Sequence, residues 1–156
     1  NDLKPSQFSY WKYVVDTTAS ETVPKNESSH FQSGANELVT WTDQNKFQLH
    51  DKKCKELLIQ FQKERVPFPG VQINSDCLEL VHHAKILGLT ITNDLKWTKH
   101  VTEIIKKANK RIYFVVQLKR AKVSPKEIIT FYCSCVAPVL EYSSEAYHFA
   151  LPACIP

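Results

Sequence analysis

The chain has 156 residues, 43% of them hydrophobic and 23% charged, which is the composition of one ordinary globular domain or of part of a larger one. No stretch approaches the roughly 18 apolar residues of a membrane-spanning helix, so no membrane partner is expected. The net charge of +4 hides an asymmetry, because residues 96–126 carry ten Lys or Arg against the single acid Glu103, which makes this segment +9 and the remainder −5. Such a block favours a polyanionic partner, nucleic acid first, although a solvated helix face is the alternative.

A β-hairpin and a helix are the first elements that the sequence predicts. Residues 10–15 form an aromatic and β-branched run, which is typical of a strand leading into a tight turn, and residues 17–23 can return as its partner. Ser28 or Ser29 can then cap a helix, because apolar residues follow at helical spacing. These apolar positions are Phe31, Ala35, Leu38 and Trp41.

Short strands are predicted in the middle of the chain. Residues 56–61 are apolar enough for one strand and residues 71–73 for a second, and residues 74–76 are typical of a turn. Residues 84–92 alternate around Gly88, which suits a single strand with a close backbone approach at the glycine.

The clearest helix covers residues 97–119, where apolar side chains recur at intervals of three and four. Basic side chains occupy much of its remaining circumference and are candidates to neutralise nucleic-acid phosphates. They are Lys99, Lys106, Lys107, Lys110 and Arg111. Trp97 and Tyr113 could stack on bases, but aromatic residues at this spacing more often belong to a core.

A second helix is predicted to begin at a capping box, with Ser124 as the cap, Pro125 at the first helical position and Glu127 at the third. Pro138 should end or bend this helix. Its expected buried face consists of Ile128, Ile129, Phe131, Tyr132 and Val136.

The cysteines and histidines form no recognisable metal-binding pattern. The five cysteines make an odd set without a Cys-x-x-Cys pair, which argues against both a zinc ribbon and a disulfide framework. A reducing, intracellular setting in the cytoplasm or the nucleus therefore fits the chain better than secretion.

Four short motifs follow one another in the chain. They are Lys12-Tyr13-Val14-Val15-Asp16, Asn45 to His50 with Lys52-Lys53-Cys54-Lys55, Ala84 to Ile91, and Asp94-Leu95-Lys96-Trp97. In this order they resemble the Tyr-x-Asp-Asp turn, the motif lysine, the Leu-Gly hairpin and the start of the thumb in the reverse transcriptases of non-LTR, LINE-like retrotransposons. The resemblance implies an α+β fold, with a partial palm of antiparallel β-hairpins and a packed helix over residues 1–92, followed by a mostly α-helical thumb over residues 93–156.

The resemblance also implies a catalytic metal site, which is incomplete in this sequence. Asp16 corresponds to the second of the two adjacent carboxylates that hold Mg²⁺ in the family, and Val15 stands at the position of the first. An alkyl side chain offers no lone pair to a hard cation, so one carboxylate remains.

Three further roles implied by the resemblance concern the pyrophosphate and the primer. Lys53 corresponds to the family's motif lysine, which stabilises the leaving pyrophosphate, and a solvated turn lysine is the alternative. Tyr13 would flank the metal site and help to seat the primer end. Leu87 and Gly88 would grip the primer strand, because a missing side chain lets the backbone approach a sugar-phosphate chain, or they would be ordinary core strand.

The first functional hypothesis is therefore a fragment of an RNA-directed DNA polymerase. Its intact parent would use an RNA template, a DNA primer and deoxynucleoside triphosphates. The chain starts on Asn1 without Met, so we expect an upstream palm segment to be missing, and this loss together with Val15 predicts that the fragment is inactive alone. The alternative is a non-catalytic nucleic-acid-binding remnant of a mobile element. A third hypothesis is a fragment that associates with other proteins through an apolar surface.

Overall fold

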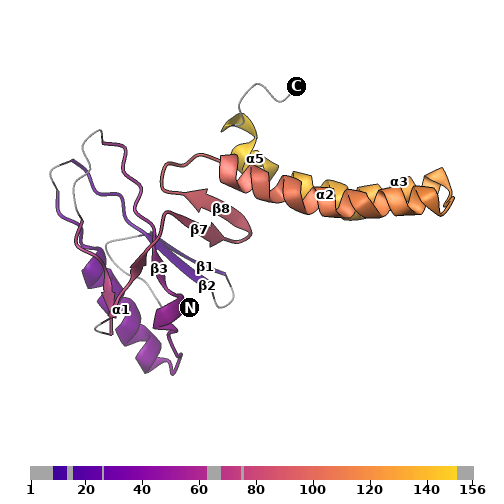
Figure 1. The fold of residues 1–156 in the computed structure, drawn as a ribbon. Coiled ribbons are helices and arrows are strands. Elements are labelled where there is room, and N and C mark those ends of the chain that lie inside the picture. Colours follow the sequence, from indigo (N-terminus) through magenta and orange to yellow (C-terminus); the bar gives the residue numbers. More distant parts are fainter. Residues whose placement is uncertain (1–8, 14–15, 26, 63–67, 75, 151–156) are drawn as a thin grey trace. The chain divides into compact units, whose positions relative to one another are not determined.

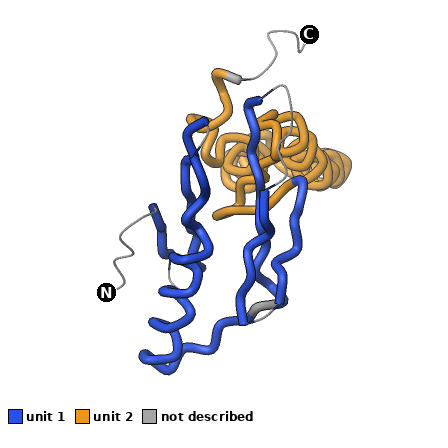
Figure 2. The backbone as a smooth tube through the Cα atoms, turned by 90° about the vertical axis from the view of Figure 1, so that its left-hand side faces the viewer, with its two compact units in different colours: residues 1–82 blue, residues 83–156 orange. Residues whose placement is uncertain are grey.

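The computed structural model describes residues 9–13, 16–25, 27–62, 68–74 and 76–150. It combines helices with small, mostly antiparallel two-stranded sheets, which confirms the predicted α+β class (Figure 1). The chain folds into two compact units, residues 1–82 and residues 83–156 (Figure 2). Among the helices that the structure describes, none has both the length and the hydropathy needed to cross a membrane.

The first unit begins with the predicted hairpin. Strand β1 (Ser9–Tyr13) pairs antiparallel with β2 (Asp16–Ser20), and Tyr13 lies opposite Asp16 at the end of the ladder. Asp16 is therefore the first residue of the returning strand. The predicted end of the first strand, at Val14 and Val15, lies outside the described residues, and β2 ends three residues before the predicted position.

Helix α1 (Phe31–Gln44) follows where the apolar spacing predicts it. The Ser29 hydroxyl accepts the backbone N–H of Phe31 at 3.1 Å and donates to the carboxylate of Glu21 at 2.5 Å, so it contacts the first turn as expected of a capping serine. The residue at the cap position itself is His30, whose backbone N–H is accepted by Glu21.

A cation lies against two stacked rings in the first unit. The Trp41 and Phe47 rings are parallel within 13° at a centroid distance of 5.5 Å, and Lys12 Nζ lies 5.1 Å from the Trp41 centroid and 5.2 Å from that of Phe47. This cation–π contact joins the hairpin to the end of α1. The same contact explains why Trp41 belongs to the packed face of the helix.

Short elements complete the first unit. They are η1 (Asp51–Lys53), β3 (Lys55–Glu56), β4 (Gln72–Ile73), β5 (Asp76–Cys77) and β6 (Glu79–Leu80), with β3 parallel to β6 and β4 antiparallel to β5. The prediction of a strand over residues 56–61 is wrong beyond Glu56. The partner strand β6 has only two residues, so the ladder cannot extend, and Phe61 is 85% exposed.

The second unit opens with a hairpin in place of the single strand predicted over residues 84–92. Strand β7 (His83–Ile86) pairs antiparallel with β8 (Leu89–Thr92). Leu87 has φ of 46° and Gly88 has φ of 89°, and two consecutive left-handed residues form the turn that fits the twist of a tight hairpin. The glycine therefore reverses the chain.

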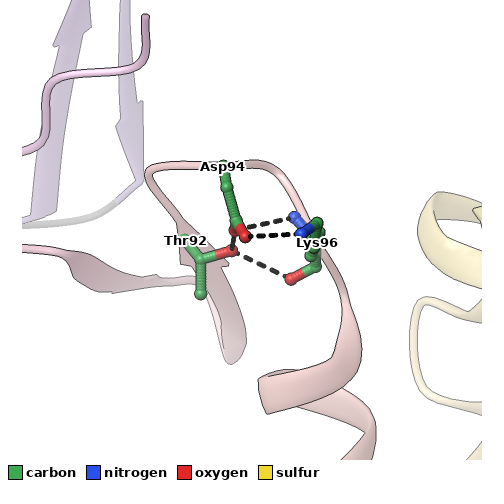
Figure 3. Close-up of polar contacts among 3 residues, drawn as sticks. All are labelled: Thr92, Asp94 and Lys96. Carbon is green, nitrogen blue, oxygen red and sulfur yellow. Dashed lines mark hydrogen bonds and ion pairs between the residues drawn. The ribbon is translucent and has the colours of Figure 1, made fainter.

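Three residues fix the connection from β8 to the next helix (Figure 3). The Thr92 hydroxyl lies 2.6 Å from Oδ1 of Asp94 and 2.9 Å from the carbonyl oxygen of Lys96. The backbone N–H of Lys96 donates to Oδ1 of Asp94 at 3.1 Å, and Nζ of Lys96 lies 3.6 Å from Oδ2 of Asp94. The hydrogen bond from Thr92 and then that from the Lys96 amide lower the pKa of Asp94. This Asp turn sets where the helix starts.

The remainder of the second unit is helical. The elements are α2 (Thr98–Arg120), α3 (Pro125–Phe131), the π-helix η2 (Tyr132–Val136), α4 (Ala137–Glu141), α5 (Ser144–Tyr147) and η3 (His148–Ala150). The predicted helix over residues 97–119 is confirmed by α2. The predicted capping box is also present, because the Ser124 hydroxyl accepts the Glu127 N–H at 3.4 Å and bonds its carboxylate at 2.9 Å.

The segment after the capping box returns alongside α2 (Figure 1). Pro138 does not end this run, because the π turn of η2 comes first and places the proline in the first turn of α4, where its missing N–H costs no hydrogen bond. Val136 is completely buried, as predicted. Ile129 is 62% exposed and not buried, because it lies about 100° around the helix from its neighbour Ile128.

Candidate nucleic-acid interface

One side of α2 is buried and the opposite side carries basic residues. His100, Ile104 and Ala108 are buried at intervals of four, which defines the packed side. Five basic or aromatic residues are among those that lie about 120° to 180° from Ile104 around the axis, at 100° per residue. We call them the outer stripe: Lys99, Lys106, Lys110, Tyr113 and Arg120. All are exposed except Lys99, which is half-buried.

The lysines of the outer stripe carry uncompensated charge. In the part of the chain that the structure describes, no acidic side chain lies within ion-pair distance of Lys99, Lys106 or Lys110. Glu103, the one acid of the basic segment, instead accepts the hydroxyl of Thr90 at 2.8 Å. The stripe therefore presents positive charge to solvent, in a form that an array of phosphates can neutralise.

Two of the five predicted basic residues lie elsewhere on the helix. Arg111 donates from Nη1 to the carbonyl oxygen of Cys135, which ties α2 to the π-helix. Lys107 is close enough to His100 for its charge to affect that residue's pKa. The structure thus brings Lys99, Lys106 and Lys110 together on one side of the helix. Lys107 and Arg111 lie apart from these three, and their role in binding nucleic acid stays a prediction.

Two aromatic residues that the sequence assigned to a core, one just before α2 and one on it, differ in their surroundings. Trp97 is half-buried, with ring centroids 6.0 Å from Tyr147 and 5.9 Å from His100, as a core residue should be. Tyr113 is 60% exposed, so its assignment to a core is wrong. Sequence reasoning considered Tyr113 as a stacking residue but preferred a core position, and it missed Arg120, although positions 99, 106, 113 and 120 recur every seven residues.

The residues predicted for pyrophosphate and primer binding lie on separate elements. Asp16 and Tyr13 are exposed at the end of the first hairpin, and Lys53 is exposed in η1. Leu87 and Gly88 form the turn between β7 and β8, and the roles implied for these residues stay predictions. Val15 lies outside the described residues.

No described residues form a ready metal site. Across the described ranges, no three His, Cys, Asp or Glu side chains are grouped so that they could hold a metal ion. The Mg²⁺ of the sequence prediction depended on the family resemblance and stays a prediction.

The family model that matches the chain is described as alkylated DNA repair protein alkB homolog 8, N-terminal, and it matches residues 97–137. No curated protein and no solved structure matches. The match covers 41 of the 156 residues and extends from Trp97, just before α2, to Ala137, the first residue of α4. It contradicts the reverse-transcriptase resemblance, because the region assigned to the thumb matches a different family. The hypothesis of a retrotransposon polymerase fragment is therefore wrong, while the division at residue 92 stays untested.

His100 is a buried histidine beside this interface. Its Nδ1 accepts the backbone N–H of Thr90 at 3.2 Å, so a neutral ring carries its proton on Nε2, which has no hydrogen-bond partner among the described atoms. Burial lowers the pKa of His100, and this effect outweighs the negative charge of Glu103, which raises it. The positive charges of Lys107 and Lys85 lower it further.

We expect protonation of His100 to destabilise the fold. The pKa of His100 in the folded chain lies below the ordinary value of 6.5. The stability that the neutral ring contributes is therefore fully present above pH 6.5 and is lost as the pH falls through the folded pKa. Between about pH 7 and pH 5, the apparent Tm of the wild type should fall more than that of His100→Asn, whose side-chain oxygen can accept the Thr90 N–H but does not titrate. Equal falls in the two proteins would exclude His100 as the source.

Proposed function

We propose that the chain is a nucleic-acid-binding module and that the outer stripe of α2 holds the phosphates. The observation that carries the proposal is the line of uncompensated lysines on the face of α2 opposite its packed side. A lysine ammonium is a mobile point charge that neutralises phosphates without reading sequence. This agrees with the alternative hypothesis of a non-catalytic binding module.

The family match supports a nucleic-acid partner without carrying over an activity. The matched family is described as a DNA repair protein, which acts on nucleic acid, and the match includes every residue of the outer stripe. It also includes most of the segment with a charge of +9. The family match and the charge pattern thus fall on the same helix.

Neutralising the stripe tests the proposal. We expect the wild-type chain to bind a labelled single-stranded oligonucleotide more weakly as salt rises, because binding releases counterions. The triple variant Lys99→Gln, Lys106→Gln, Lys110→Gln should bind more weakly at low salt. Its plot of log K against log salt should be less steep by about 2, since each phosphate contact on a single strand contributes about 0.7. Fluorescence anisotropy over a salt series measures both quantities.

A matched control separates the stripe from overall charge. The variant Lys25→Gln, Lys46→Gln, Lys126→Gln removes three exposed lysines outside the stripe and the same total charge. It should retain a salt dependence close to that of the wild type. An equal loss in both variants, or wild-type binding that salt does not weaken, would contradict the proposal. Circular dichroism of each variant confirms that it is folded.

A further inference from the structure

Tyr113 gives the outer stripe a feature that phosphate binding alone does not need. We propose that the stripe binds single-stranded nucleic acid in preference to a duplex, with the Tyr113 ring as a platform on which an unpaired base stacks. This inference rests on the proposed function and names its substrate class.

The ring is open to solvent and held by one aromatic neighbour. Tyr113 is 60% exposed and Phe114 is 55% exposed, and their rings meet edge to face, with centroids 5.8 Å apart and planes at 74°. In such a pair, the edge of one ring meets one face of the other, so each ring keeps at least one face that its partner does not cover. A pair of exposed rings in this arrangement is suited to stacking with a base.

The charges are spaced so that a strand contacting them must also pass the ring. Lys106, Tyr113 and Arg120 follow each other every seven residues, which is about 10.5 Å along the axis per step. Cations therefore lie on both sides of the aromatic ring on the same face of α2. A strand whose phosphates contact both cations passes Tyr113, where an unpaired base can turn onto the ring.

Polar side chains flank the ring and acids do not. Asn109 and Gln117 lie one turn before and one turn after Tyr113, where their amides can donate to and accept from base edges. The nearest acid before Tyr113 on this helix is Glu103, which is ten residues away and bound to Thr90. The surroundings of the ring thus favour a base and repel no phosphate.

The conformation of the nucleic acid decides whether the ring can contribute. Bases in a duplex are stacked on each other and expose only their edges in the grooves, whereas a single strand can turn its base faces toward an aromatic side chain. The lysines contribute to both complexes. The ring contributes to the single-stranded complex alone, which gives the preference its physical basis.

Binding to matched probes tests this inference. We would measure anisotropy of the full chain with 12-nucleotide oligouridine and oligothymidine strands, and with 12-base-pair RNA and DNA duplexes. Tyr113→Ala should weaken binding of the single strands about tenfold, because stacking on one aromatic side chain is worth about that factor, and should change duplex binding less than about twofold. Tyr113→Phe, which keeps the ring, should retain single-strand affinity.

The controls distinguish the failure of this inference from that of the proposed function. Phe149→Ala removes an aromatic ring that is 94% exposed and outside the stripe, and it should leave binding unchanged. Salt-dependent binding that Tyr113→Ala leaves intact, or weakens equally for both kinds of probe, would overturn the single-strand preference alone. An absence of salt-dependent binding to any probe would overturn the phosphate-binding function and this inference with it.

Discussion

Tyr147→Ala is expected to lower the free energy of unfolding of the second unit by about 3–5 kcal/mol, the range for removing a large buried aromatic ring. Tyr147 is 3% exposed, and its ring centroid lies 5.0 Å from that of His100 and 6.0 Å from that of Trp97. These contacts join the C-terminal helices to the start of α2, so the substitution leaves a cavity where two ends of the unit meet. Urea unfolding followed by circular dichroism measures the loss.

A conservative variant separates the ring of Tyr147 from its hydroxyl. The hydroxyl donates to the carbonyl oxygen of Leu140 at 2.7 Å, and burial raises the pKa of the tyrosine, so it remains a donor at neutral pH. Tyr147→Phe keeps the ring and loses this one bond, which should cost about 1 kcal/mol. A Tyr147→Ala protein within about 1 kcal/mol of the wild type would show that the aromatic cluster does not hold the unit together.

Gly88→Val should destabilise the second unit by about 2–4 kcal/mol, because two costs add. Gly88 has φ of 89°, a conformation that a β-branched residue strongly disfavours. A Cβ at this position would also lie 3.1 Å from Cε1 of Tyr142, whose hydroxyl donates to the Leu87 carbonyl at 2.8 Å. The tyrosine ring must shift to make room for the added side chain, which strains its hydrogen bond to Leu87. Thermal and urea unfolding measure the effect.

Gly70 provides the matched control for this substitution. A Cβ at Gly70 would meet no heavy atom of the described residues within 4 Å, and its backbone is not in the left-handed region. Gly70→Ala should therefore change stability by less than about 0.5 kcal/mol, or raise it slightly by restricting the unfolded chain. If Gly88→Val is as mild as Gly70→Ala, then the hairpin turn and the Tyr142 contact contribute little to the fold.

The sequence predicted those elements of the fold whose determining residues all lie within one short segment. The apolar spacing of α1 and α2 and the capping box at Ser124 belong to this class. The hairpin between β7 and β8 does not, because the apolar alternation continues on both sides of Gly88 and Leu87 is not a typical turn residue. The strand expected beyond Glu56 failed for another reason, since a ladder needs a partner of equal length and no sequence pattern shows the partner.

The basic site was predicted in part for a similar reason. Composition placed the positive charge on α2, but five lysines and arginines on a helix look equivalent until the buried face is known. Only the structure shows that Arg111 bonds to the π-helix while Lys106 and Lys110 face outward. The exposure of Tyr113 likewise depends on which neighbours cover the helix, and the sequence does not state this.

The π-helix η2 acts as a one-residue spacer in the return segment. Such a turn accommodates one residue more than an α-helical path of the same rise, so α4 is rotated by about 100° relative to an uninterrupted helix. That rotation helps to bring Tyr142, the residue after α4, onto the hairpin turn. Tyr147 is placed by a second feature, because the backbone leaves the helix at Tyr142 and is left-handed at Ser143 before α5 begins. The extra residue in η2 thus redirects the end of α4, and the two residues after α4 set where the last aromatic side chain docks.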